Sequence, residues 1–436
     1  MLIEFSVKNF RSIKERQTLS MVSATGGELR QTNTMRILDG RLTLLRSVAI
    51  YGPNASGKTN LIRALQTMRR IVLSSAQRQR GDDIRVTPYL FDHTAQTQPC
   101  EFEVIFISDG IRYQYGFTAT NKQILEEWLF AYPKGRSQTW IDRKFDQSTQ
   151  KYEWGNTDKL TGTKQLWQEA TRSNALFLST AIQLNNTQLQ PAFDWFKVKL
   201  KIVGLDALGP RFTLEQCEIA QSKQQIIDFL QAADFNIDDL EVESEAEDVE
   251  HLLEELPNAS RERLAERLKD ANNAKVKKFR VRTVHVGSNK ERFTIDMNDE
   301  SDGTQKFFAF AGPWLDVLEK GYVLIVDELN DNLHPKLVRF LVQMFHNPVL
   351  NQQDAQLIFT THETSILSQD VFRRDQVWFT EKDKYNATTL YPLSDFSPRK
   401  ETENLEKNYL QGRYGALPYF QDITNISEGR SEPQST

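Results

Sequence analysis

Residues 52–59, G-P-N-A-S-G-K-T, combine the residue types and the spacing needed to hold phosphate groups. They match the pattern G-x-x-x-x-G-K-[ST] in full. The glycines let the backbone turn closely around an anion, the lysine brings a positive charge to the β- and γ-phosphates, and the threonine hydroxyl ligates magnesium. A chance glycine turn before a helix is the other interpretation. The complete motif, with an apolar strand before it and an amphipathic helix after it, favours a phosphate-binding loop.

This loop predicts which residues contact a nucleotide. The backbone amides of its second half can point at phosphate oxygens, helped by the positive end of the helix that follows. The predicted nucleotide-binding residues are Asn54, Ala55, Ser56, Gly57, Lys58, Thr59 and Asn60. We expect ATP and Mg²⁺ to bind here, with Lys58 also acting in catalysis and Thr59 as a metal ligand.

A second motif, Y-V-L-I-V-D-E at residues 322–328, is typical of a buried parallel strand that ends in two carboxylates. Asp327 is expected to hold the magnesium, and Glu328 to polarise the attacking water as a catalytic base. The alternative is a buried strand followed by a solvated acidic turn. Together with the phosphate-binding loop, the motif predicts hydrolysis of ATP.

A third apolar strand, Q-L-I-F-T-T-H at residues 356–362, ends in a histidine. Taken alone, His362 fits a hydrogen-bonded core residue better than a functional one. Because it ends the strand that follows the acidic motif, a catalytic sensor of the γ-phosphate becomes the better interpretation.

The order of these motifs resembles the ABC-type, AAA-like ATPase heads of the SMC, RecF and OLD group. Such heads begin with a strand and an N-F-R-S turn, present here at residues 9–12, and the resemblance implies a nucleotide contact for Arg11. They also carry an S-G-G signature before the acidic strand. The segment E-S-D-G-T-Q provides Ser301 and Gly303 as nucleotide contacts, with Asp302 in place of the first glycine. After Glu328, the segment L-N-D-N-L-H-P occupies the D-loop position, where Asn332 and His334 are implied to make contacts across a dimer.

Further motifs narrow the resemblance. The Leu-His-Pro turn, the stretch I-R-Y-Q-Y-G-F, the stretch N-A-L-F-L-S (174–179) and the stretch N-Y-L-Q-G-R-Y-G-A-L-P (408–418) are together similar to ATPases associated with abortive phage infection, of the RloA or AbiLi type. The similarity extends from residue 1 to about 425. In that family the ATPase is usually encoded beside a second protein, often one with a TOPRIM-type nuclease domain, so the resemblance implies such an effector as a partner.

The implied fold is α/β: a P-loop NTPase head of the ABC type, with a mixed sheet, an N-terminal antiparallel layer and an inserted, mainly helical domain. Two β-rich stretches separated by Ser108-Asp109-Gly110 predict a hairpin of that layer. The expected parts are an N-terminal lobe (1–160), a helical insertion (161–274), a C-terminal lobe (275–425) and a disordered tail (426–436).

Two strongly charged segments have two interpretations each. Residues 241–257 carry eight acidic side chains, and we expect a solvated turn leading into a short helix; a docking surface for a basic partner is the alternative. Residues 275–286 alternate in the period of a strand and hold the densest basic cluster of the sequence, Lys275, Lys277, Lys278, Arg280 and Arg282. This strand either has a solvated cationic face or contacts nucleic-acid phosphates, for which no DNA-binding module gives support.

Bulk properties limit the remaining choices. The 436 residues include only Cys100 and Cys217, too few for a disulfide framework, and no apolar run approaches 18 residues. We therefore expect a cytoplasmic protein without a membrane partner. The residues after His362 are too few for a TOPRIM domain, and no heptad pattern predicts long coiled-coil arms. Chemistry on nucleic acid would have to come from a partner.

These observations predict an ATP-gated switch. In such heads Ser301 of one subunit faces the γ-phosphate held at Lys58 of another, so ATP joins a homodimer or a larger homo-oligomer. The favoured function is the sensor and scaffold of a two-gene anti-phage system, which controls a separately encoded effector and responds to a phage-encoded trigger. The alternatives are a RecF-like DNA repair ATPase that binds DNA and an ATPase that regulates another toxin.

Overall fold

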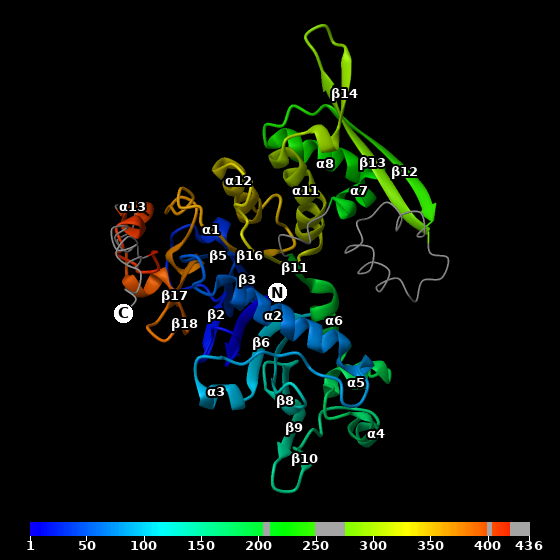
Figure 1. The fold of residues 1–436 in the computed structure, drawn as a ribbon, viewed down its shortest axis with the longest axis vertical. Helices are drawn as coiled ribbons and strands as arrows, with labels where there is room; N and C mark the ends of the chain where they lie inside the picture. The colour runs from blue at the N-terminus through cyan, green and yellow to red at the C-terminus, as the bar shows by residue number, and fades with distance from the viewer. Residues whose placement is uncertain (204–209, 249–274, 399–402, 419–436) are drawn as a thin grey trace, which may run out of the picture. The chain divides into compact units, whose positions relative to one another are not determined.

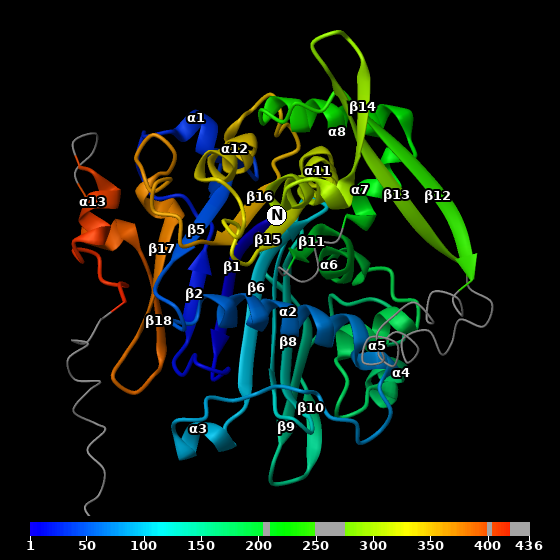
Figure 2. The same ribbon diagram turned by 45° about the horizontal axis from the view of Figure 1, so that its top comes forward.

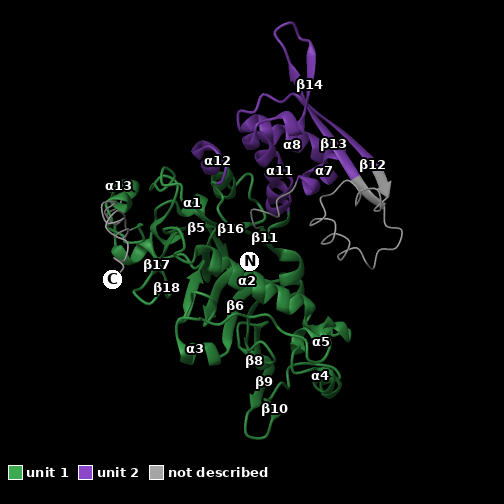
Figure 3. Cartoon of the chain, in the orientation of Figure 1, with its two compact units in different colours: residues 1–203, 320–330, 341–436 green, residues 204–319, 331–340 purple. Residues whose placement is uncertain are grey.

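The computed structural model describes residues 1–203, 210–248, 275–398 and 403–418 (Figure 1). The chain forms two compact units, unit 1 with Met1–Val203, Lys320–Asn330 and Leu341–Thr436, and unit 2 with Gly204–Glu319 and Asp331–Phe340 (Figure 3). The expected insertion began at residue 161, whereas unit 2 begins at Gly204. Residues 161–203 belong to unit 1 because their last strand joins its sheet. The expected tail, 426–436, lies outside the described residues.

A six-stranded sheet in unit 1 carries the phosphate-binding loop. Its order is β11 (Leu200–Val203), β15 (Val323–Val326), β16 (Gln356–Thr360), β5 (Ser47–Tyr51), β17 (Val377–Lys382) and β18 (Thr388–Pro392). All neighbours are parallel except β17 and β18, which are antiparallel. The central strands β5, β15 and β16 are buried along their whole length, as their apolar runs predict. Three motif-bearing strands are thus neighbours that point in one direction.

An antiparallel sheet of seven strands forms the second layer of unit 1. Its order is β10 (Lys151–Trp154), β9 (Gln138–Asp146), β8 (Ile124–Tyr132), β7 (Ile111–Ala119), β6 (Cys100–Ser108), β1 (Leu2–Lys8) and β2 (Gln17–Ser20). The predicted hairpin is β6–β7; its turn residues Asp109 and Gly110 have φ of 50° and 75°, as a two-residue hairpin turn requires. The two sheets confirm the predicted α/β class with an antiparallel layer. A short pair, β3 (Thr34–Ile37) and β4 (Leu42–Leu45), adds a small ribbon.

Helix α2 links the two sheets. The helices are α1 (Arg30–Asn33), α2 (Lys58–Ser74), α3 (His93–Thr97), α4 (Lys164–Ala170), α5 (Phe177–Gln183), α6 (Gln190–Asp194), α7 (Arg211–Cys217), α8 (Ala220–Ala232), α11 (Asp302–Lys320), α12 (Pro335–His346) and α13 (Leu405–Leu410). The buried face of α2 includes Leu61, Leu65 and Met68, at helical spacing, and belongs to one core cluster with β1, β5 and β6. None of the described helices is long and apolar enough to cross a membrane.

Unit 2 combines α7, α8 and most of α11 with the sheet β12 (Asp239–Asp248), β13 (Lys275–Val286) and β14 (Arg292–Asp296). The predicted strand at 275–286 is confirmed as β13. The prediction of a turn and a short helix from residue 241 is wrong as far as residue 248, because those residues form β12; residues 249–256 lie outside the description.

The acidic and the basic segment are neighbouring strands whose opposite charges lie across from each other. Strands β12 and β13 are antiparallel, with Glu241 opposite Arg282 and Glu243 opposite Arg280. The Arg282 guanidinium lies 3.3 Å from a Glu243 oxygen and 3.8 Å from a Glu241 oxygen. Opposite charges across an antiparallel pair are stabilising, so the acidic residues favour this strand over the helix. The cationic face is thereby partly neutralised within unit 2.

A buried histidine connects α12 with the base of β5. His346 Nε2 lies 2.7 Å from the Ser47 hydroxyl and 3.3 Å from Gln376 Nε2. Burial, with a smaller contribution from the charge of Arg46, lowers the pKa of His346 to about 3. The folded protein therefore holds a neutral imidazole at this position down to acidic pH.

This burial predicts a pH dependence of stability. Between about pH 6.5 and pH 3 the unfolded chain binds a proton at His346 and the folded chain does not, so the free energy of unfolding falls as pH decreases, by up to about 1.4 kcal/mol per pH unit. Urea unfolding across this range should give a shallower pH dependence for His346→Gln than for the wild type. The exposed His93→Gln is the matched control, and equal slopes for wild type and His346→Gln would contradict the assignment.

Candidate functional site

The phosphate-binding loop runs from β5 to α2 and contains two glycines that lie against neighbouring strands. Gly57 has φ of 115° and precedes the first residue of α2, and Ala55 has φ of 64°. A Cβ on Gly52 would lie 2.4 Å from the carbonyl oxygen of Thr380, and one on Gly57 would lie 2.2 Å from the hydroxyl of Thr388. Only glycine fits at these two positions, because strands β17 and β18 lie directly against the loop.

Buried hydroxyl groups hydrogen-bond to the loop and to one another. The Ser56 hydroxyl lies 2.6 Å from that of Thr380, and the Thr388 hydroxyl lies 2.8 Å from both the Ser56 carbonyl oxygen and the Ser12 hydroxyl. The Asn60 side-chain amide donates to Ser12 at 2.8 Å. The side chain of Asn60 is therefore engaged with the N-F-R-S turn, although the sequence placed it among the nucleotide contacts.

Lys58 is a buried cation that is held by main-chain oxygens. Its ammonium donates to the carbonyls of Gly52 at 2.6 Å and Pro53 at 3.1 Å. Burial lowers the pKa of Lys58 to about 8, against the opposing influence of the carboxylates of Glu328 and Asp327. The lysine thus lies within electrostatic reach of both acidic residues, and Thr59, beside it on α2, is half-buried. This brings together the lysine and the acidic pair that the sequence predicted.

A single threonine orders the acidic turn after β15. The Thr360 hydroxyl donates to Asp327 Oδ1 at 2.6 Å and accepts the backbone N–H of Glu328 at 2.7 Å. Glu328 has φ of 54°, a left-handed conformation that costs a non-glycine residue roughly 1–2 kcal/mol. Hydrogen bonds to both sides of the turn compensate for this cost. Thr360 was not predicted as a site residue, although a hydroxyl at the end of the neighbouring strand was a usable signal.

The histidine strand is joined to the same turn. The Asn330 side-chain oxygen accepts the Thr361 hydroxyl at 2.9 Å and the backbone N–H of His362 at 3.1 Å. Partial burial, followed by the charge of Lys58, lowers the pKa of His362, while Asp327 raises it. His362 therefore lies near the lysine and the magnesium-ligand candidate, with its main chain fixed by Asn330. The role of Asn330 was not predicted.

The N-F-R-S turn presents Arg11 at the surface. Both Asn9 and Arg11 have positive φ, of 52° and 53°, and the Arg11 backbone N–H donates to the Thr87 carbonyl at 2.8 Å. Ser12, the next residue, carries the hydrogen bonds to the loop region described above. The turn is thus built into the base of the phosphate-binding loop, with the Arg11 side chain exposed.

The predicted signature and D-loop residues belong to unit 2. The Ser301 hydroxyl accepts the Thr304 backbone N–H at 3.1 Å and so caps the start of α11. A Cβ built on Gly303 would lie 3.5 Å from the Asn332 carbonyl oxygen, so the helix start and the D-loop are in contact. An ion pair of 2.6 Å between Lys306 and Asp331 joins the same two segments. Ser301, Asn332 and His334 are all exposed.

The motif N-Y-L-Q-G-R-Y-G-A-L-P (408–418) forms the end of α13 and the turn after it, and α13 contacts the segment that follows His362. The Thr364 hydroxyl donates to Glu406 at 2.9 Å, and the Tyr51 hydroxyl donates to the Glu363 carbonyl at 3.2 Å. The Tyr51 ring lies 5.9 Å from that of Tyr409, edge to face. Tyr51 immediately precedes the phosphate-binding loop, so α13 stabilises both the loop and the segment after His362.

The motif N-A-L-F-L-S begins α5 and anchors it to α2 and the antiparallel sheet. The Ser179 hydroxyl donates to the Val72 carbonyl at 2.6 Å. The buried carboxylate of Glu127 accepts the backbone N–H groups of Phe177 and Leu178 at 2.6 and 3.0 Å. The residues of this motif therefore have a structural role, which is to attach α5 to its neighbours.

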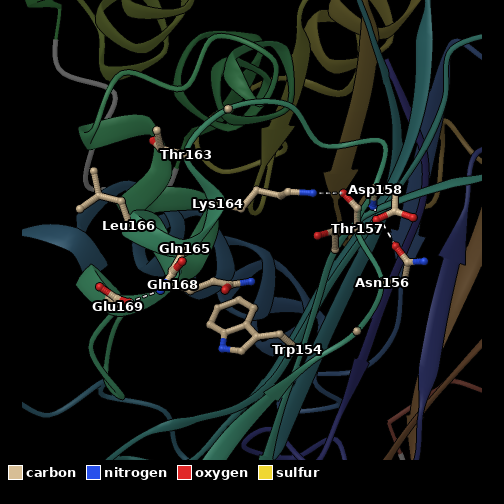
Figure 4. Close-up of a pocket in the computed structure, with 12 residues that line it drawn as sticks. Trp154, Asn156, Thr157, Asp158, Thr163, Lys164, Gln165, Leu166, Gln168 and Glu169 are labelled. Carbon is tan, nitrogen blue, oxygen red and sulfur yellow. Dashed lines mark hydrogen bonds between the residues drawn. The ribbon is translucent and has the colours of Figure 1, made fainter.

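An open hollow of about 1060 Å³ lies elsewhere in unit 1, between β10 and α4 (Figure 4). Its lining is mainly polar, and the Lys164 ammonium spans it to donate to the Thr157 carbonyl at 3.1 Å. None of the residues that the sequence predicts for nucleotide chemistry lines this hollow.

A family model matches most of this sequence. The model of a family described as "AAA domain, putative AbiEii toxin, Type IV TA system" matches residues 47–368, which include all of the strand motifs above. No curated protein matches the sequence. Among solved structures, the "SmcHead bound to the C-winged helix domain of ScpA" is 12% identical with a TM-score of 0.36, and covers 90% of this chain and 97% of its own. The protein "cbiO1 from clostridium perfringens", part of the ABC transporter complex cbiONQ, is 11% identical with a TM-score of 0.26, over 91% of this chain and 96% of its own. Likeness at these scores bears neither on fold nor on function.

The depressed pKa of Lys58 predicts proton uptake when a nucleotide binds. At pH 8 about half of the lysines are neutral in the free protein, and the phosphates should restore the charge, so that binding takes up about half a proton. Titration calorimetry at pH 8 in buffers of different ionisation enthalpy measures this number. Uptake should be smaller at pH 6.5. Equal uptake at both pH values would assign it to another group.

Proposed function

The chain belongs to the family of AAA domains related to the AbiEii toxin, and on that premise we propose that it hydrolyses ATP to ADP and phosphate as the switch subunit of an anti-phage system. The observation that supports this most is the convergence of three strand ends. The lysine after β5, the acidic pair after β15 and the histidine after β16 are connected through Thr360, Asn330 and mutual electrostatics.

ATP would lie with its phosphates in the loop between Gly52 and α2. Strands β17 and β18 exclude a Cβ at both glycines and hold the loop at the start of α2, whose N-terminal end suits an anion. Lys58 would exchange its two carbonyl partners for phosphate oxygens. The donors available to Mg²⁺ are the Thr59 hydroxyl and the Asp327 carboxylate, hard oxygen ligands that suit this ion. When bound, Mg²⁺ would neutralise charge on the phosphates.

Glu328 is the group we propose as the base that orients and polarises the attacking water. Its strained turn directs the main chain away from Asp327, so that the two adjacent carboxylates serve different roles. His362 would sense the γ-phosphate with a largely neutral imidazole, in line with its lowered pKa. Thr360 is a positioning residue, because it acts through Asp327 and Glu328.

We propose that a second subunit completes the site. Ser301 and Gly303 at the start of α11, with Asn332 and His334 in the adjoining D-loop, form one exposed group within unit 2. The N-terminal end of a helix, with its positive dipole, suits the γ-phosphate of ATP bound to another copy. ATP would then join a symmetric dimer, or a larger ring, and hydrolysis would loosen it.

The output of this switch would be control of a separately encoded effector, of which a TOPRIM-type nuclease is the kind implied by the motif resemblance. A phage-encoded trigger would change the assembly and release or activate that effector. Co-expression with the neighbouring gene product, followed by measurement of the mass and composition of the purified complex, tests this part directly. A chain that purifies alone in every nucleotide state would contradict it.

The role of Glu328 predicts a separation of binding from hydrolysis. Glu328→Gln should bind ATP with near wild-type affinity and hydrolyse it on the order of 100-fold more slowly, because the base is lost while the phosphate contacts remain. It should also accumulate an ATP-dependent dimer in light scattering. The exposed Glu319→Gln is the matched control, and full turnover by Glu328→Gln would show that another group is the base.

Completion of the site in trans predicts complementation. Lys58→Ala and Ser301→Arg should each be inactive alone, the first for lack of ATP binding and the second with binding intact. Mixed in equal amounts, they form heterodimers with one complete site, so roughly a quarter of wild-type ATPase activity should return. Phosphate release assays measure this, and a mixture as inactive as its components would contradict action in trans.

A further inference from the structure

Five arginines gather along α2 and the segment that returns beside it. They are Arg11, Arg63, Arg70, Arg78 and Arg85, and we call them the arginine surface. Figure 2 shows the segment after α2 running back alongside that helix towards α3. All of these residues belong to unit 1, and all except the half-buried Arg78 are exposed.

Hydrogen bonds fix the arrangement of this surface. The Arg70 guanidinium donates to the Arg85 carbonyl at 3.1 Å, which attaches the returning segment to α2. Two residues further, the Thr87 carbonyl accepts the Arg11 backbone N–H at 2.8 Å. Arg63 and Arg70 are seven residues apart on α2, so they lie on one face about 10 Å from each other. The positions are thus set by a helix and by main-chain contacts.

The five arginines form few interactions with acidic side chains, and the clearest is the influence of the Asp82 charge on Arg78. Among the described residues, none of the five arginines forms an ion pair within 4.0 Å. The nearby Asp83 is paired with Lys122 at 2.7 Å. One terminal nitrogen of Arg78 is buried without a hydrogen-bond partner. Burial and the charges of Arg63 and Arg70 lower the pKa of Arg11, which agrees with a close group of like charges.

We propose that the arginine surface binds the phosphate backbone of duplex DNA. Guanidinium groups match phosphate geometry with two parallel hydrogen bonds, and a rigid helix spaces them along a line. The surrounding exposed side chains include Gln66, Gln77 and Gln79, of a type that also donates to phosphates.

The composition of the surface favours DNA over the other polyanions. Between residues 58 and 87 no large hydrophobic side chain is exposed; the exposed Leu90 and Phe91 follow the five arginines in the sequence, just before α3. An interface with an acidic protein would contain an apolar centre, whereas protein–DNA interfaces are polar and strongly positive. A single strand would need exposed aromatic rings on which its bases stack, and this stretch has none. A duplex needs only backbone contacts.

Two arginines of the basic strand β13 differ from this surface, because they lie near acidic side chains. It was the densest basic cluster of the sequence, yet Arg282 is paired with two glutamates of β12 and Arg280 lies 4.0 Å from Asp296. The five arginines that form no ion pair among the described residues thus lie on unit 1, whereas a phosphate contact at β13 was only the alternative interpretation of the sequence. The inference concerns binding without nucleotide, so it stands or falls separately from the proposed ATPase function.

Fluorescence anisotropy with a labelled 20-base-pair duplex, recorded without nucleotide over 50–200 mM salt, tests the proposal. Five phosphate contacts predict that log K falls against log[salt] with a slope of roughly −4 to −5. The double variant Arg63→Gln/Arg85→Asn should reduce the slope by about 2 and weaken binding at least 10-fold at 100 mM salt. Asparagine suits the left-handed conformation of Arg85, whose φ is 59°, so the backbone is preserved.

The matched control is Arg280→Gln/Arg282→Gln on β13, which should leave both slope and affinity unchanged. Circular dichroism and thermal melting check that each variant is folded. The proposal is overturned if the wild type does not bind the duplex at 50 mM salt, or if the β13 variant loses binding instead. Tighter binding of poly-glutamate than of the duplex would assign the surface to an acidic protein and would also overturn it.

Discussion

The parallel register of β15, β16 and β5 determines where every reacting group of the proposed site lies. Val326 is opposite Phe359, and Thr360 is opposite Ile50, so the residues that follow leave the sheet at one edge. A slip of one residue would turn the Thr360 hydroxyl to the opposite face of the sheet, away from Asp327. Complete burial of these strands makes such a slip costly. The buried apolar strands thus determine the positions of the polar residues at their ends.

Positively charged side chains have different partners in three parts of the chain. In unit 2 the glutamates of β12 compensate the arginines of β13. In the phosphate-binding loop, carbonyl oxygens hold Lys58, which remains available for an incoming anion. Along α2, Arg63 and Arg70 form no ion pair within 4.0 Å among the described residues. Helix α2 therefore presents positive charge both at its start and along its exposed face, and two anionic ligands of different size could be bound by one rigid element.

Much of the site could be predicted from the sequence because its motifs are short and local. The loop, the acidic pair and His362 were each read from one strand and the residues after it. Thr380 and Thr388 could not be found in this way, because they act on the loop from more than 300 residues away and only the fold brings them there. The edge strand β11 was missed because its residues 200–203, L-K-I-V, continue a helical stretch. The acidic stretch became β12 through a cross-strand partner that local patterns do not reveal.

One of the connections between the two units lies directly after the acidic turn. The backbone passes between the two units four times, after residues 203, 319, 330 and 340. The stretch Lys320–Asn330, with Asp327 and Glu328 at its far end, is a strap of unit 1 attached to unit 2 at both ends. Only Leu329 and Asn330 separate the acidic pair from the point where the chain enters unit 2. The residues proposed for hydrolysis and the connection between the units therefore share one short segment of backbone.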